Sequence, residues 1–323
     1  MRPLLLCALV IVGCAPKDEA GGPVDAGPVD APSNDAAPFA CARPTKVTTI
    51  PTACNGEPAL CDRTFDRVTF PMTHNAMSNA DEKWAPPNQT HGIARQLEDG
   101  IRGMMLDVHF YDPDSGATDV PRADLSPGEQ TYLCHSVCAL GRRPLADGLC
   151  DVTKFLDTHR GEVFSIIFES YVQSSDLAEA MKASGLLDYV YTHQKGTPWP
   201  TLRELIAKDT RVVVFTEDGD DTPDWNHSAW KNIWDTPYTF TSASEFTCKL
   251  NRGQTTNPLF LINHWIGNPL SDVKYAHEVN VKAVLGARVQ QCTTEAGRPP
   301  TFVGVDFYDV GDLFEVVRTS NGL

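Results

Sequence analysis

Short apolar runs alternate with amphipathic stretches between residues 67 and 319. Runs rich in apolar, β-branched and aromatic residues predict strands. Eight such runs occur, at residues 67–71, 104–110, 131–135, 163–169, 189–192, 211–217, 259–265 and 301–308. Apolar residues spaced three and four apart predict helices between them, at residues 93–98, 144–159, 177–184, 202–208, 271–287 and 311–319.

The alternation of strands and helices indicates βαβ units around a parallel sheet. Eight strands favour a (β/α)8 TIM barrel, an α/β fold, over a doubly wound sheet, and the weak fifth run predicts an irregular barrel. Neither a GxGxxG string nor a P-loop occurs, which argues against a nucleotide-binding fold. In such a barrel the chemistry lies at the carboxyl ends of the strands.

The first 40 residues follow a different pattern. Met1 and Arg2 precede an apolar run at residues 4–12 that is too short to span a bilayer and is typical of an export signal. Residues 11–14 (IVGC) resemble a bacterial lipobox, in which Cys14 is lipidated; the alternative is an ordinary secretory signal cleaved nearby. We expect a signal peptide (1–14), a disordered Pro/Ala/Gly/Asp linker (15–40) and a folded domain (41–323).

These predictions place the protein outside the cytoplasm. We expect it in the bacterial cell envelope as an outer-membrane lipoprotein, held on the membrane by its amino-terminal lipid, or as a secreted protein. No other stretch is apolar over the roughly 20 residues that a membrane-spanning helix requires.

Composition and charge exclude several classes of protein. Hydrophobic residues make up 41% of the chain, which is enough for a large core and excludes a disordered chain. The 42 Asp and Glu residues outnumber the 27 Lys and Arg residues, for a formal net charge of -15. The chain therefore lacks the positive field that nucleic acid binding requires. We expect a globular monomer without a nucleic acid partner.

The ten cysteines fit an oxidising compartment. Setting aside Cys7 and Cys14 leaves eight, an even number that favours disulfides. The expected pairs are Cys54 with Cys61, Cys248 with Cys292, and Cys134 with either Cys138 or Cys150. The alternative is a zinc site that includes Cys134 and Cys138, but no second pair at metal-ligand spacing follows.

Polar residues gather where the predicted strands end. They are His74 and Asn75, Asp107 and His109, His135, Glu169, His193, Glu217, His264 and Asp306. No Lys or Arg is among them, so the carboxylates would repel one another unless a cation or shared protons offset their charge. Oxygen ligands suit Ca²⁺ or Mg²⁺, whereas a cluster of histidines would suit zinc.

Each of these residues also has a purely structural interpretation. We expect His193 and His264 to be hydrogen-bonded structural residues. Asp306 could simply cap the last strand, and Glu217 could belong to a solvated acidic loop. The remaining histidines fall in predicted helices or loops and are expected at the surface; they are His91, His159, His227 and His277.

Four strings, in matching order and spacing, resemble the motifs of the phosphatidylinositol-specific phospholipase C X-domain family. They are residues 70–77 (FPMTHNAM), 100–108 (GIRGMMLDV), 133–135 (LCH) and 155–169 (FLDTHRGEVFSIIFE). Residues 199–202 (WPTL) and 211–216 (RVVVFT) resemble a branch of exported bacterial and plant members. The resemblance runs from about Cys54 to Asp309 and implies a TIM-barrel phosphodiesterase that acts on a phospholipid.

The resemblance also implies roles for individual residues. His74 matches the first family histidine, which contacts the phosphate or takes the proton of the attacking hydroxyl. His135 matches the second, the general acid that protonates the leaving oxygen. An aspartate near the last strand orients the first histidine in metal-independent relatives, and Asp306 is the candidate for that role. Two histidines suit proton transfer in both directions because imidazole titrates near neutral pH.

The implied metal ligands are Asn75, Asp107 and Glu169, which match the calcium ligands of metal-dependent members. Ca²⁺ is expected, with Mg²⁺ as an alternative. The chain departs from those members at Met105, where they have a carboxylate that is a further ligand and candidate base. Metal-independent members instead have an arginine at the position of Asp107. Arg102 carries the same charge but is expected below the catalytic layer.

Three functional hypotheses follow. The first is a tethered phosphodiesterase that cleaves a phospholipid such as phosphatidylinositol by intramolecular attack. The second is a related enzyme for another phosphodiester, such as a glycerophosphodiester or a sphingomyelin-like lipid, although the paired Glu-x-Asp of those relatives is missing from the second strand. The third is a non-catalytic surface module that binds a ligand; both His74 and His135 are present, which argues against it.

Overall fold

The computed structural model describes residues 39–119 and 129–323. The predicted signal peptide, its Cys14 and nearly all of the predicted linker lie outside these residues. Within them, no helix is both long enough and apolar enough to cross a bilayer.

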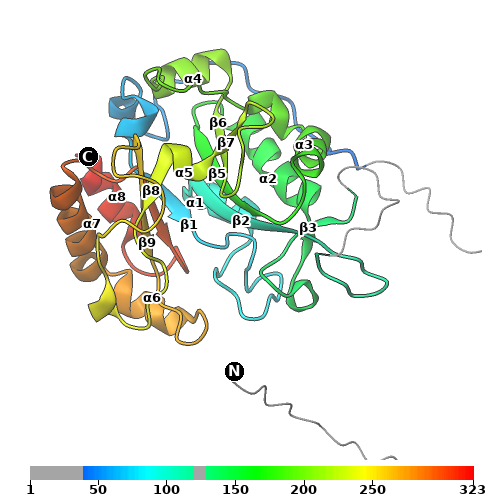
Figure 1. The fold of residues 1–323 in the computed structure, drawn as a ribbon. Helices are drawn as coiled ribbons and strands as arrows, with labels where there is room; N and C mark the ends of the chain where they lie inside the picture. Colours follow the sequence, from blue (N-terminus) through cyan, green and yellow to red (C-terminus); the bar gives the residue numbers. More distant parts are fainter. Residues whose placement is uncertain (1–38, 120–128) are drawn as a thin grey trace, which may run out of the picture. The chain divides into compact units, whose positions relative to one another are not determined.

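A ten-stranded sheet forms the centre of the domain (Figure 1). Its strands are β1 (Phe70–Thr73), β2 (Gly103–Phe110), β3 (Thr131–Leu133), β4 (Arg143–Pro144), β5 (Phe164–Ser170), β6 (Val212–Thr216), β7 (Asn226–Ser228), β8 (Ile233–Asp235), β9 (Leu259–His264) and β10 (Phe302–Val305). Eight of them follow the order β7-β6-β5-β2-β1-β10-β9-β8, and all neighbours in this order pair in parallel. The fold is therefore the α/β, barrel-like one that the sequence predicts.

The barrel is open. No pairing joins β7 to β8 in the described part of the chain, and the four-residue helix α5 (Ala229–Asn232) connects these two strands. The parallel sheet thus curls round without closing. This agrees with the expected irregularity, although its location was not predicted.

Two of the eight predicted strands are not strands of the parallel barrel. The run at 131–135 is not a barrel strand, because β3 pairs antiparallel with the end of β2 and with β4. The run at 189–192 forms only a single bridge, between Val190 and Val212, after the 3-10 turn Leu186–Tyr189. Instead, the short strands β7 and β8 take the outer places of the curled sheet.

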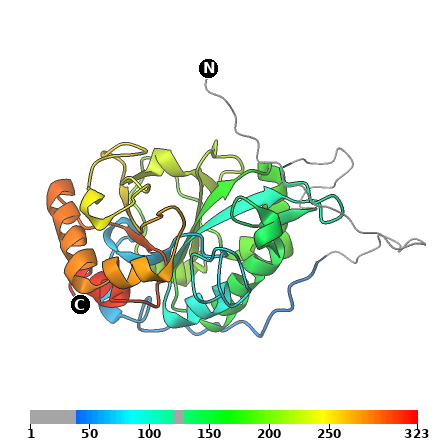
Figure 2. The ribbon, with the colours of Figure 1, turned by 90° about the horizontal axis from the view of Figure 1, so that it is seen from below.

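Helices cover the outside of the curled sheet. They are α1 (Ile93–Asp99), α2 (Leu145–Thr158), α3 (Ser174–Ala183), α4 (Leu202–Lys208), α6 (Val273–Val279), α7 (Lys282–Ala296) and α8 (Leu313–Ser320). Seen from below, α7 and α2 lie at opposite ends of the domain with the sheet between them (Figure 2). The single helix predicted at 271–287 is broken at Asn280, because its side-chain amide binds the carbonyl of Asp306 and its own carbonyl accepts from the N–H of Asp312.

Alternation along the strands sorts side chains between two layers of core. Met104, Leu106 and Val108 of β2 pack in the larger cluster with the outer helices, whereas Met105 lies in the second cluster inside the curl. Asp107 shares the inward face of Met105 because side chains alternate along a strand. The pattern of β2 thereby directs one carboxylate into the barrel.

All eight expected cysteines form disulfides. The pairs are Cys41–Cys150, Cys54–Cys61, Cys134–Cys138 and Cys248–Cys292. The alternative left open for Cys134 is resolved in favour of Cys138, and the zinc interpretation of that pair is wrong.

Residues 39–53 form a strap without helix or strand, which we call the amino-terminal strap. Cys41 bonds it covalently to α2, and Val47 donates its N–H to the carbonyl of Asp157 at 2.7 Å. Arg43 adds a forked contact to the carboxylate of Asp157, at 2.9 and 3.0 Å. The strap is thus fixed to the helix layer before β1 begins.

Candidate active site

His74 follows β1 directly and lies where the barrel strands end. Its N–H donates to the carbonyl of Val305, and its own carbonyl accepts from the side chain of Gln89. Its ring stacks on Trp265, with centroids 3.8 Å apart and planes 5° apart. Backbone and ring contacts together leave His74 little freedom to rotate.

Asp306 follows β10 and contacts the imidazole ring of His74 at Nδ1. Its carboxylate lies 2.8 Å from Nδ1 of His74. The same carboxylate accepts from the amide of Asn88 at 3.2 Å and from the hydroxyl of Ser271 at 2.6 Å. Because the carboxylate can only accept when ionised, Nδ1 carries the proton and Nε2 of His74 is left as the basic nitrogen.

His135 reaches the site from the loop after β3. Its Nε2 lies 3.2 Å from the side-chain nitrogen of Asn75, a buried residue in the left-handed conformation (φ 45°) next to His74. Asn75 is therefore next to His74 in the chain and in contact with His135. Burial lowers the pKa of His135 below its usual value, and the nearby His74 lowers it further.

Three carboxylates share a hollow of about 180 Å³ beside His74. Asp107 and Glu169 come from adjacent strands in register, and Glu217 follows β6. Burial raises the pKa of Asp107 well above its usual value, and the charges of the other two raise it further. Burial and the charge of Glu169 likewise raise the pKa of Glu217 to about 7, against the opposing effect of Arg252. Glu217 is thus a site residue and not part of a solvated loop.

Arg252, which lies between β8 and β9, is a site residue that the sequence did not indicate. Its guanidinium donates to Glu217 at 2.8 Å and to the fully buried Asp235 at 2.6 and 2.9 Å. It also lies over the rings of Trp230 and Tyr238, at 3.9 and 4.6 Å. No strand-end signal marks Arg252, because a loop and not a strand carries it.

The chemistry of these donors fits a hard divalent cation in part. Asn75, Asp107 and Glu169 all line the hollow and offer oxygen atoms, which Ca²⁺ and Mg²⁺ prefer. Burial and the charges of Glu169 and Glu217 disfavour an ionised Asp107, and a bound cation would oppose that effect. Met105 lines the same hollow and offers no oxygen ligand. Within the described residues, no three His, Cys, Asp or Glu side chains form a ready-made metal site.

Among the histidines of the described residues, His74 alone lines this hollow, and His135 is reached through Asn75. His264 is fully buried, donates from Nε2 to the carbonyl of Val279 and accepts at Nδ1 from Arg288, which agrees with the structural role expected for it. His193 stacks on Trp199, at 3.8 Å. His227, which we expected at the surface, is buried in β7, where its Nε2 accepts from the N–H of His193.

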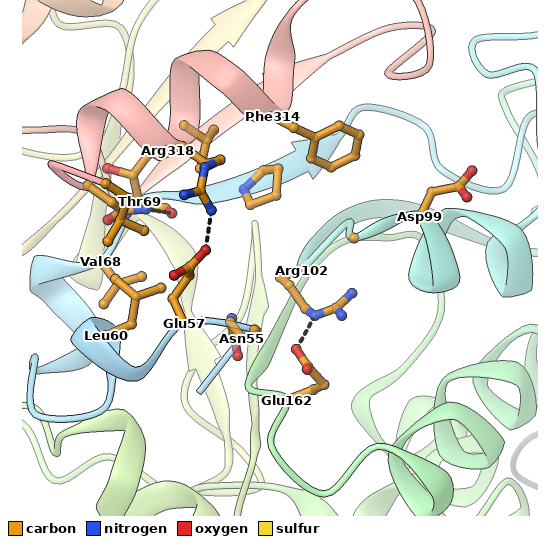
Figure 3. Close-up of a pocket in the computed structure, with 16 residues that line it drawn as sticks. Asn55, Glu57, Leu60, Val68, Thr69, Asp99, Arg102, Glu162, Phe314 and Arg318 are labelled. Carbon is orange, nitrogen blue, oxygen red and sulfur yellow. Dashed lines mark hydrogen bonds and ion pairs between the residues drawn. The ribbon is translucent and has the colours of Figure 1, made fainter. Parts of the chain in front are cut away.

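Arg102 lies at the opposite end of the strands, as expected. It immediately precedes β2 and faces a hollow of about 360 Å³, where it is ion-paired with Glu162 at 2.6 Å (Figure 3). Arg318 of α8 faces the same hollow and is paired with Glu57. This hollow is larger than the one beside His74, yet it adjoins the amino ends of β1 and β2, away from the histidines.

The chain is similar in sequence to known proteins. The chain is 28% identical to the PI-PLC X domain-containing protein 1 of Arthroderma benhamiae, over 86% of this chain and 93% of that protein. It is 26% identical to a protein of the same fungus described as an uncharacterized secreted protein, over 84% of this chain but only 64% of that protein.

A solved variant of the phosphatidylinositol-specific phospholipase C of Staphylococcus aureus has the same fold. Its TM-score is 0.54 at 12% identity, over 81% of this chain and 95% of that one. The family model described as PI-PLC X 1 matches residues 60–321, which include β1 to β10 and the whole of the site. The chain therefore belongs to the PI-PLC X domain family.

Proposed function

We propose that this protein is an exported phosphodiesterase that cleaves a phospholipid, such as phosphatidylinositol, by attack of a neighbouring hydroxyl on the phosphate. One observation carries the proposal: His74 is bonded to a buried aspartate, and the residue that follows it, Asn75, contacts His135. Such a pair can serve as base and acid for one phosphodiester.

The roles of the two histidines follow from their partners. His74, whose Nδ1 is held by Asp306, accepts the proton of the attacking hydroxyl at Nε2, and the carboxylate stabilises the imidazolium that forms. His135 gives a proton to the leaving diacylglycerol oxygen. Burial lowers the pKa of His135, and the negative charge of a bound phosphate would raise it again and favour the protonated form that this step requires. Reversal of both transfers would allow water to open a cyclic phosphate.

A divalent cation, Ca²⁺ or Mg²⁺, would be held by Asn75, Asp107 and Glu169. When bound, it would stabilise negative charge on a phosphoryl oxygen. Met105 leaves this set one carboxylate short, so we expect a weak site. Removal of the cation by a chelator should abolish turnover, and added Ca²⁺ should restore it.

The surface around the site suits a substrate embedded in lipid. Large apolar side chains are exposed in the segments that follow β3, β5, β8 and β9. They are Val137 and Leu140 after β3, Tyr171 after β5, Tyr238 after β8, and Leu270 and Val273, the first residue of α6, after β9. We call them the apolar rim. Exposed apolar side chains of this kind gain free energy when they enter a lipid interface. The rim would bring the hollow beside His74 against the membrane.

Export is consistent with the four disulfides and with a relative described as secreted. We further propose that lipidation of Cys14 tethers the protein to the bacterial outer membrane. The lipid tether and the apolar rim would then both bind to a membrane.

The decisive experiment is a panel of phosphodiester lipids assayed with the purified protein, with and without Ca²⁺. We expect a cyclic phosphate to appear before the monoester. His74→Ala and His135→Ala should each lose about 10²- to 10⁴-fold in turnover, whereas His159→Ala, a surface histidine at the end of α2, should lose nothing. A direct acyclic product, insensitive to chelator, would refute the proposed mechanism and favour another phosphodiester as substrate.

A further inference from the structure

His135 lies inside the smallest disulfide loop in the described part of the chain. Cys134 and Cys138 are 4 residues apart in sequence, and His135 directly follows Cys134. The other three disulfides join residues separated by 7, 44 and 109 positions. A disulfide restricts the unfolded chain more when its loop is longer. The Cys134–Cys138 bond therefore contributes least to global stability by this route, and its main effect is local.

The sheet itself does not hold His135. β3 ends at Leu133, and the last bond to β2 runs from the N–H of Cys134 to the carbonyl of Asp107, at 3.3 Å. β4 pairs with β3 through only two residue pairs, and one of its members, Pro144, has no N–H to donate. His135 is thus the first residue beyond the ladder.

The residues after His135 face solvent. Ser136 is exposed and adopts the left-handed conformation (φ 59°), and Val137 is exposed as well. By contrast, the two bonded cysteines are fully buried and belong to the core cluster outside the sheet. The disulfide therefore fastens both ends of an exposed turn to the core, with the candidate general acid at one end of it.

Burial of both cysteines indicates a structural disulfide and not one that exchanges with thiols. Thiol exchange requires an attacking thiolate to reach a sulfur atom. Because both cysteines are buried, an attacking thiolate does not reach this bond in the folded protein.

We propose that the Cys134–Cys138 disulfide is a positioning element for His135, which it holds against Asn75 on the leaving-group side of the phosphate. The role of His135 in this inference rests on the proposed function. The restraint of the turn by the disulfide, which we call the brace, rests on the loop geometry alone. A misplacement of about 1 Å in a positioned group costs on the order of 10²-fold in rate. Loss of the brace should therefore lower catalysis without unfolding the barrel.

The test compares two double variants. Cys134→Ala with Cys138→Ala removes the brace, and Cys54→Ala with Cys61→Ala is the matched control, because it removes another short disulfide loop near the amino ends of the strands. We expect the first to lose about 10- to 10²-fold in kcat on the lipid substrate. On an aryl phosphodiester, whose phenolate leaves without protonation, the same variant should lose less than about threefold in kcat. The control should be unchanged on both substrates.

A double-mutant cycle separates positioning from a general structural effect. In a His135→Ala background, removal of the brace should cause no further loss of kcat, because its only target is already absent. An equal loss in both backgrounds would show that the disulfide acts independently of His135 and would overturn the proposal.

Two further measurements guard against misfolding and against an inactive wild type. Two glycines inserted between Ser136 and Val137 keep the bond and loosen the turn; this variant should show the same dependence on the leaving group, and unchanged kinetics would refute the brace.

Amide exchange of residues 134–138 should accelerate in the unbraced variant while β5 stays protected. Unchanged exchange would also refute it. If the wild type cleaves no phosphodiester, the proposed function fails while this exchange measurement still decides the brace.

Discussion

The contact between His74 and Asp306 supports a quantitative prediction. Asp306→Asn keeps the shape of the side chain and removes its charge. The carboxylate now accepts from His74, Asn88 and Ser271. An asparagine has a single acceptor oxygen and two N–H donors. We expect its amide to turn toward Nδ1 of His74, so that the proton moves to Nε2 and the basic nitrogen is lost.

The magnitude follows from the distance and the burial. Nδ1 and the carboxylate oxygen are 2.8 Å apart, and the side chain of Asp306 is only 6% exposed. Charges about 4 Å apart at an effective dielectric constant of about 20 interact by about 4 kcal/mol. If this stabilises the imidazolium in the transition state, kcat should fall on the order of 10³-fold.

The assay is turnover of the preferred lipid by the purified variant, with thermal unfolding as a check on the fold. Ser271→Ala is the matched control, because it removes one neutral donor to Asp306 and leaves the charge in place. It should lose less than about tenfold in kcat. Asp306→Asn with turnover within about threefold of the wild type, and with an intact fold, would refute the assigned role of Asp306.

Three other predictions concern the surface, the core and the tether. Leu140→Glu and Leu270→Glu should weaken binding to phospholipid vesicles in a sedimentation assay and leave turnover of a soluble phosphodiester unchanged, whereas Ile50→Glu, an exposed position in the amino-terminal strap, should affect neither. Burial lowers the pKa of His264 to about 3, so the unfolded chain binds a proton there below about pH 6.5 that the folded protein does not. The free energy of unfolding should therefore fall by up to about 1.4 kcal/mol per pH unit between pH 6 and pH 3, and His264→Gln should flatten this slope in urea titrations; an equal slope in both proteins would contradict it. Cys14→Ser should abolish labelling by a radioactive fatty acid, and an unlabelled wild type that starts elsewhere would end the lipoprotein interpretation.

The sequence predicted the strands whose apolar runs are long. β2, β5, β6 and β9 all fall within one or two residues of their predicted positions, and α4 has the predicted bounds. β7 was missed because its three residues, Asn226, His227 and Ser228, are polar and carry no strand pattern. The run at 131–135 was misassigned because an apolar run does not reveal whether its partner is parallel or antiparallel.

The site was predictable only where strands or family motifs mark it. His74 and Asn75 follow β1, Asp107 lies in the second half of β2, and the structure brings all three to one hollow. The contact between His74 and Asp306 spans 232 residues and could not be derived from spacing; the family resemblance suggested it. Arg252 was missed because it lies in a loop, where position depends on tertiary contacts with Asp235 and Trp230.

The attachment of the amino-terminal strap bears on how the domain withstands force. If residues before the strap are anchored in a membrane, any pull on them reaches Cys41 first and passes through a covalent bond into the middle of α2. The ion pair of Arg43 with Asp157 joins the strap to the same helix and would transmit part of the force to it. The pull therefore bypasses residues 54–69 and β1, whose end positions His74. Without the Cys41–Cys150 bond, the same pull would run along the chain toward β1 and could peel it from its neighbours β2 and β10.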